Sequence, residues 1–126
     1  NETFDASNIN RQYGATRFNI GKSKAFETAK ALRAITDDTR IIIYPRGINE
    51  GEVDHFLEGC DIVLDEIEFG AVAARILLHQ RARARKIPIL CGNSVGFGTR
   101  LFLFTPESRT VEEMLGVTLA QAKEYE

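Results

Sequence analysis

Three short apolar runs, separated by segments with helical character, constrain the fold of this 126-residue chain most strongly. The runs lie at residues 40–44, 61–65 and 87–91, and each is rich in aliphatic side chains. The segments between them, residues 50–58 and 70–86, place apolar residues at helical spacing. This alternation predicts right-handed crossovers on a parallel sheet. The near-continuous apolar strands are typical of a sheet that is covered on both faces.

Further elements are expected on either side of this pattern. A helix should begin at residue 21 or 22 and end near residue 35, and Ser7 or Asn8 should cap a short helical turn before it. A fourth strand at 101–104 follows the glycine-rich turn 92–98 without a helix between, so it could be an antiparallel edge strand. Thr110 and Thr118 should cap two short final helices. The sequence thus predicts a single α/β domain over residues 1–126, with a Rossmann-like, doubly wound, mainly parallel sheet.

Composition excludes several functional classes. A formal net charge of −2 gives no basis for general binding to nucleic acid or to an anionic membrane. No apolar run approaches the roughly 20 residues that span a bilayer, and the polar opening residues predict no signal peptide. The two cysteines lie far apart, which favours free thiols in a reducing cytoplasm over a disulfide. Two cysteines and two histidines at this spacing make no structural zinc site.

Polar residues gather where ligands bind in doubly wound sheets, beyond the carboxyl ends of the strands. Asp65, Glu66 and Glu68 form a carboxylate cluster at one such end. Arg11 and Lys24 supply cations elsewhere, and both residue types bind phosphate, arginine in a bidentate manner and lysine as a mobile point charge. This combination would suit a nucleotide together with its metal ion.

Two motifs near the beginning of the chain resemble one family. Ser7-Asn8-Ile9-Asn10-Arg11-Gln12, followed by Ile20-Gly21-Lys22-Ser23-Lys24-Ala25, is similar to the S-N-L-x-R-Q and G-x-x-K motifs of the ThiF/MoeB/HesA family. These are adenylating enzymes related to ubiquitin-activating enzymes. The spacing from Arg11 to Lys24 fits the family pattern without a gap. Residues 61–65, 75–79 and 86–90 resemble the family's D-x-V-x-D, R-x-x-L-N and K-x-P-L-V segments.

The resemblance implies an ATP-dependent adenylyltransferase that activates the C-terminal carboxylate of a ubiquitin-like or sulfur-carrier protein. Asn8, Arg11 and Lys24 would contact ATP, Gln12 would lie in the same site, and Glu2 would correspond to an acid of the ribose-binding strand end. Arg11 and Lys24 would stabilise charge during the reaction.

The resemblance also implies Mg²⁺, a homodimer and a cytoplasmic location. Glu68 takes the place of the family's metal-binding aspartate. The family's first strand and its G-x-G-G-x-G loop are not among these residues and would lie upstream of Asn1. The sequence therefore predicts an N-terminally incomplete fold of the ThiF type, with poor activity on its own. The Gly96-Phe97-Gly98 segment is no replacement, because it precedes a strand rather than a helix.

Less specific interpretations stay open at this point. Arg11 could be a solvated loop residue, Glu66 and Glu68 could end a solvated loop, and Asp65 could cap the following turn. Asn93 and Ser94 could contact a bound peptide tail, as the equivalent loop does in the family. Two other functional classes remain: a nonenzymatic scaffold or regulatory member of the fold, and an NAD-dependent oxidoreductase, against which the Arg11–Lys24 pair argues.

Overall fold

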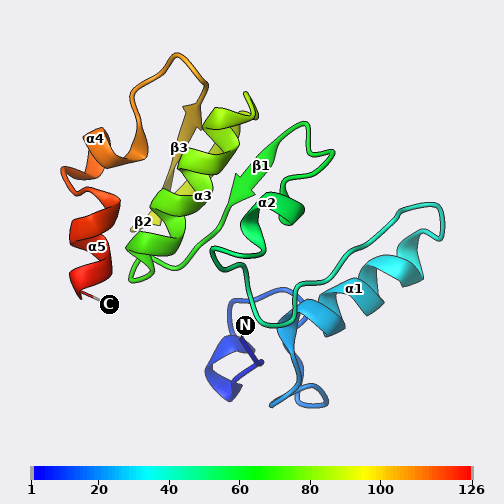
Figure 1. Cartoon of the computed structure of the whole chain (residues 1–126). Helices are drawn as coiled ribbons and strands as arrows, with labels where there is room; N and C mark the ends of the chain where they lie inside the picture. The colour runs from blue at the N-terminus through cyan, green and yellow to red at the C-terminus, as the bar shows by residue number, and fades with distance from the viewer. Residues whose placement is uncertain (1, 126) are drawn as a thin grey trace. The chain divides into compact units, whose positions relative to one another are not determined.

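The structure is a computed structural model that describes residues 2–125. It divides into two compact units, residues 1–47 and 48–126. The N-terminal unit contains the 3-10 helix η1 (Ala6–Asn8) and the helix α1 (Lys24–Ile35). The C-terminal unit contains α2 (Val53–Phe56), β1 (Val63–Asp65), α3 (Val72–Ala84), β2 (Ile89–Val95), β3 (Gly98–Phe104), α4 (Val111–Leu115) and α5 (Leu119–Tyr125) (Figure 1).

The C-terminal unit is an α/β structure, as the alternating pattern predicts. Its sheet has the strand order β1-β2-β3, with β1 parallel to β2 and β2 antiparallel to β3. The helix α3 connects the two parallel strands, and β3 is the antiparallel addition expected after the third apolar run. The glycine-rich turn is shorter than predicted, because residues 92–95 continue β2 and only Gly96 and Phe97 separate the paired Val95 and Gly98. Gly96 has a φ of +59°, which favours glycine in a two-residue hairpin.

The helix α3 is the centre of the C-terminal unit. It runs beside the sheet in Figure 1, and it contacts α2, α4 and α5. One hydrophobic cluster joins it to α2 and the parallel strands through Leu57, Val63, Leu77 and Ile89. A second cluster joins it to α4 and α5 through Ile76, Val111 and Ala122. Because α3 is packed on both sides, its seven residues from Ala73 to His79 are buried with the exception of Ala74.

Three predicted elements differ from the structure. Residues 40–44 form no strand, since a strand requires a ladder partner and the sheet contains only β1 to β3; Ile42 is 56% exposed. The helix predicted at 50–58 is reduced to α2, because Asn49 first closes a turn by accepting a hydrogen bond from the Gly51 N–H at 2.9 Å. Asp5, rather than Ser7 or Asn8, caps η1 by accepting from the Ser7 N–H.

Two expectations about the whole chain can be compared with the residues that the structure describes. Cys60 and Cys91 are both free thiols, as predicted. Within residues 2–125, none of the helices has the length and apolar character needed to cross a membrane.

The end of α4 provides a test of this architecture. Gly116 adopts a left-handed conformation with a φ of +71°, and its N–H donates to the Glu112 carbonyl at 2.7 Å. We expect Gly116→Ala to lower the free energy of unfolding of the C-terminal unit by about 1 kcal/mol, because a Cβ disfavours this conformation. Urea denaturation measures the change. Gly70→Ala is the matched control, because Gly70 has no positive φ and a Cβ there meets nothing within 4 Å; equal effects of the two changes would contradict the prediction.

Candidate functional site

Backbone hydrogen bonds in the N-terminal unit bring two predicted site residues together. The Phe4 N–H donates to the Lys22 carbonyl at 2.9 Å, and the Gly21 N–H donates to the Phe4 carbonyl at 2.8 Å. The Lys24 N–H in turn donates to the Glu2 carbonyl at 2.9 Å. These contacts hold the first residue of α1 next to Glu2.

The Lys24 side chain also contacts Glu2. Its ammonium group forms an ion pair and hydrogen bond with the Glu2 carboxylate, and it lies 6.0 Å from the centroid of the buried Phe4 ring. The hydrogen bond from Lys24, reinforced by its charge, lowers the pKa of Glu2. Glu2 is therefore a carboxylate at neutral pH. One of the three ammonium donors of Lys24 is engaged by it.

Asn8, Arg11 and Gln12 follow one another on and after η1. Asn8 is buried and closes a capping box, since its Oδ1 accepts from the Asp5 N–H at 3.0 Å. The exposed Arg11 guanidinium donates to the Ser7 carbonyl and, at 3.4 Å, to Oδ1 of Asn10. Gln12 is half-buried, and its N–H donates to the Asn8 carbonyl at 2.8 Å. Among the described residues, no hydrogen bond links Arg11 to Lys24.

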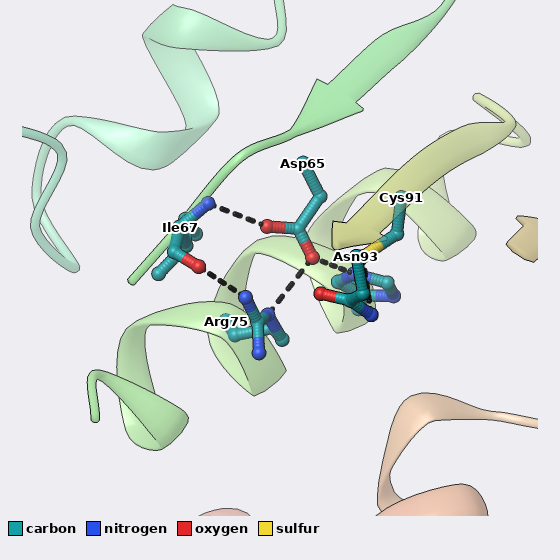
Figure 2. A network of polar contacts seen from close by, with 6 residues as sticks. Asp65, Ile67, Arg75, Cys91 and Asn93 are labelled. Carbon is teal, nitrogen blue, oxygen red and sulfur yellow. Dashed lines mark hydrogen bonds and ion pairs between the residues drawn. The ribbon is translucent and has the colours of Figure 1, made fainter. Parts of the chain in front are cut away.

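A second polar centre lies in the C-terminal unit, around Asp65 at the carboxyl end of β1. Its Oδ2 accepts from Nε of Arg75 at 3.0 Å and lies 2.9 Å from Nε2 of His79. Its Oδ1 accepts from the Ile67 N–H at 2.9 Å. Arg75 also donates to the Ile67 carbonyl, so one guanidinium joins the strand end to the loop that follows it (Figure 2).

The charge state of this centre follows from its contacts. Burial alone would raise the pKa of Asp65. Hydrogen bonds from His79 and the Ile67 N–H, together with the Arg75 charge, outweigh burial and lower the pKa. Burial, followed by the nearby Asp65 charge, raises the pKa of Cys91 on the neighbouring strand, so its thiol stays protonated at neutral pH. A protonated buried thiol is a poor nucleophile, which agrees with a structural role for Cys91.

The carboxylates of Asp65, at the end of β1, and of Glu66, directly after it, point to different sides of the sheet. Asp65 faces α3, whereas Oε1 of Glu66 lies 3.5 Å from the position that a Cβ would take on Gly92, next to Leu101. Glu68 is exposed, and among residues 2–125 there is no group of three metal-ligating side chains. Asp65 has both oxygens engaged by protein donors and is unsuited to a metal ion. Mg²⁺ in nucleotide sites needs only one or two carboxylates besides the phosphates, so an exposed Glu68 is chemically compatible with it.

The polar centre contains two residues whose role the sequence interpretation missed. Both lie in the segment 75–79, which the sequence identifies only by its resemblance to a helix segment of the family. A signal is present in the sequence: Arg75 and His79 are four residues apart, hence on one face of a helix, inside an otherwise apolar stretch. Two polar side chains on a buried helix face require a buried partner, and the strand-end aspartate is one.

Asn93 and Ser94, the candidate tail-binding residues, line a cavity of about 500 Å³ on the α3 side of the sheet. The other lining residues come from β1 and its following loop, α3, β2, β3 and α4: Asp65, Phe69, Arg75, Cys91, Val95, Arg100, Phe102, Phe104, Val111, Met114 and Leu115.

Removal of Arg75 tests the energetic role of the polar centre. We expect Arg75→Met to lower the free energy of unfolding by about 3 kcal/mol at pH 7, because Asp65 is then a buried charge with fewer partners. The pKa of Asp65 is lowered in the folded state, so its stabilising contribution is present above the unfolded pKa of about 3.9 and is lost as pH falls through the folded pKa. The difference between wild type and variant should therefore shrink below about pH 4.

Urea denaturation at pH 7 and at acidic pH measures both effects. Arg81→Met is the control on the same helix, because Arg81 is partly exposed and pairs with Asp54 at 3.6 Å. That change should cost less than about 1 kcal/mol at either pH. A loss at Arg75 no larger than the loss at Arg81 would show that the buried network contributes little.

The Lys24–Glu2 pair can be tested separately. In Lys24→Ala the pKa of Glu2 should rise toward its ordinary value, since both the hydrogen bond and the charge of the lysine are removed. NMR titration of the Glu2 side chain measures it. Lys22→Ala removes an equal charge two residues away and should leave the pKa of Glu2 almost unchanged; the same rise in both variants would mean that the pair is not specific.

Comparison with known proteins supports the motif resemblance. A model of the ThiF family matches residues 1–124. A protein of Mycobacterium tuberculosis (strain CDC 1551 / Oshkosh), named "Uncharacterized protein MT1398", is 29% identical over 93 residues, which is 74% of this chain. The matched region is 13% of the length of that protein. Because the family match extends over nearly the whole sequence, this chain belongs to the ThiF family.

Proposed function

We propose that this chain takes part in ATP-dependent adenylyl transfer to a carboxylate, the C terminus of a ubiquitin-like or sulfur-carrier protein. The observation that carries the proposal is the placement of Lys24 at the start of α1, fixed by backbone bonds next to Glu2. Arg11, with an exposed guanidinium, follows η1 in the same unit. Membership of the ThiF family supports this assignment.

For adenylyl transfer, the protein mainly has to supply positive charge near the phosphates of ATP. A carboxylate oxygen attacks the α-phosphorus of ATP, the bond from that phosphorus to the bridging oxygen breaks, and pyrophosphate leaves with its electron pair. The products are an acyl-adenylate and pyrophosphate. Arg11 and Lys24 would stabilise the negative charge that develops on the phosphate oxygens, as preorganised cations do in phosphoryl-type transfer. Lys24 can pair with Glu2 and still direct two further donors at phosphate.

The neighbouring residues would position the nucleotide. Glu2 is a carboxylate whose pKa is lowered by Lys24, so it can accept hydrogen bonds from ribose hydroxyls at neutral pH. The buried Asn8 maintains the η1 turn that presents Arg11, and the half-buried Gln12 lies one residue beyond it.

The proposal extends to the cofactor and to the assembly. Glu68 would hold Mg²⁺ together with the phosphates, and the bound metal would neutralise phosphate charge. We further propose a homodimer, as is usual in the family, and a cytoplasmic location, for which the two free thiols are a supporting observation.

Exchange of radioactive pyrophosphate into ATP tests the proposed reaction in the protein that contains this chain, with its carrier substrate present. Arg11→Ala combined with Lys24→Ala should reduce exchange by about 10²-fold or more, because both charge-stabilising groups are removed. The matched control is Arg17→Ala combined with Lys22→Ala. It removes the same two charge types from the same unit, where Arg17 stacks on the ring of Phe18 at 4.5 Å.

Each result has a clear meaning. Loss of exchange in the first double variant but not in the control supports the adenylation site. Undiminished activity of the first variant in its pathway would favour a scaffold or regulatory role. Selective binding of NAD over ATP in a titration of the same proteins would overturn the adenylation proposal in favour of an oxidoreductase.

A further inference from the structure

The cavity on the α3 side of the sheet is lined by side chains that share one face of β2 and β3. Cross-strand neighbours share a face, and Cys91 pairs with Phe102 while Asn93 pairs with Arg100. Residues two apart on one strand also share a face, so these four side chains lie on the face that carries Asp65 and α3. Met114 from α4 also lines the cavity.

The charge in this cavity favours an anion. One carboxylate, Asp65, and two guanidinium groups, Arg75 and Arg100, line it, which leaves one positive charge in excess. Asp65 and Arg75 neutralise each other at the buried end, at 3.0 Å. Arg100 is exposed, and among residues 2–125 no acidic side chain or carbonyl accepts a hydrogen bond from it. A planar guanidinium without a partner suits bidentate binding of a carboxylate.

The walls favour a bulky apolar group beside that anion. Phe69 is 80% exposed on the loop after β1, and Phe102 and Met114 are only partly covered. A volume of about 500 Å³ lies in the range of small-molecule sites, and apolar walls with a few polar groups are typical of them. A tail of two glycines has no side chain to cover these walls, whereas an aromatic or branched side chain would bury them.

We propose that this cavity binds a carboxylic acid that carries an aromatic or branched apolar group, with Arg100 holding the carboxylate and Phe69, Phe102 and Met114 contacting the apolar group. The binding itself needs no nucleotide. That this acid is the substrate class of the adenylation, with a bulky group rather than a diglycine end, rests on the proposed function. The acid can be a free small molecule or the last residue of a peptide.

NMR of the protein that contains this chain gives a direct test, because Met114 lines the cavity and carries a methyl group. The Met114 signal is identified by its loss in Met114→Leu. Titration with 3-phenylpropanoate should shift this signal with a dissociation constant of about 1 mM or lower. The alcohol 3-phenylpropan-1-ol and acetate should each bind at least about tenfold more weakly, because each lacks one of the two recognised groups. Peptides that end in phenylalanine or in two glycines distinguish the sources: a shift with the free acid alone identifies a small molecule, and a shift with the phenylalanine peptide identifies a chain end.

Two pairs of variants localise the binding. Arg100→Gln should weaken binding of 3-phenylpropanoate about tenfold, whereas Arg109→Gln, whose guanidinium donates to the Glu113 carbonyl, should not. Phe69→Ala should weaken it several-fold, whereas Phe97→Ala, at the fully exposed hairpin turn, should not. An amide spectrum like that of the wild type confirms that each variant is folded.

The proposal is overturned if the Met114 signal does not respond to the acid, if acid and alcohol bind equally, or if the diglycine peptide binds best. It is also overturned if the Arg100 and Arg109 variants behave alike. Failure of the proposed function is distinguishable: the acid would bind as described, yet no exchange of pyrophosphate into ATP would depend on it.

Discussion

The C-terminal unit depends on the hydrogen bonds and the ion pair that stabilise a single buried carboxylate. Asp65 is 1% exposed, so its charge is tolerable only because Arg75, His79 and the Ile67 N–H surround it. Two of these groups come from α3 and one from the loop after β1. The same interaction therefore fixes α3 relative to the strand and fixes the direction in which the loop leaves it. Phe69, the exposed wall of the cavity, lies on that loop.

The four residues from Asp65 to Glu68 contain acidic side chains with two different roles, one buried and structural and two exposed. Asp65 has both oxygens engaged by protein donors and acts on the structure, whereas Glu66 and Glu68 are exposed and remain accessible to ligands. The pleat enforces the separation, because neighbouring residues of a strand point to opposite faces. An acid that binds a ligand in this region must therefore come from the loop and not from the strand end.

The sequence predicts the elements whose pattern is repeated over many residues. The α3 helix and the strands β1 to β3 follow from apolar periodicity. The α1 helix is also predicted, but it begins at Lys24 rather than at residue 21 or 22. The strand expected at 40–44 does not form, because local propensity cannot supply a ladder partner. The Asp65 network was missed for a related reason: each residue alone has a simpler explanation, and only the i, i+4 spacing of Arg75 and His79 indicates a shared partner. The positions of Arg11 and Lys24 in one unit could be expected, but the Glu2 carboxylate as the partner of Lys24 could not.

The uneven distribution of the core has a consequence for the residues of the proposed nucleotide site. Both hydrophobic clusters consist of residues from the C-terminal unit, and within residues 2–47 only Phe4 and Ala29 are buried apolar side chains. The contacts that hold Glu2, Lys24 and η1 in place are mostly hydrogen bonds near solvent, which contribute little net stability. Local opening of this segment should cost far less free energy than opening of α3, and hydrogen exchange of its amides should be correspondingly faster. A ligand that binds Arg11 and Lys24 would have to order the segment, and this ordering would cost part of the binding free energy. A substitution that makes the free segment more rigid would therefore raise the affinity.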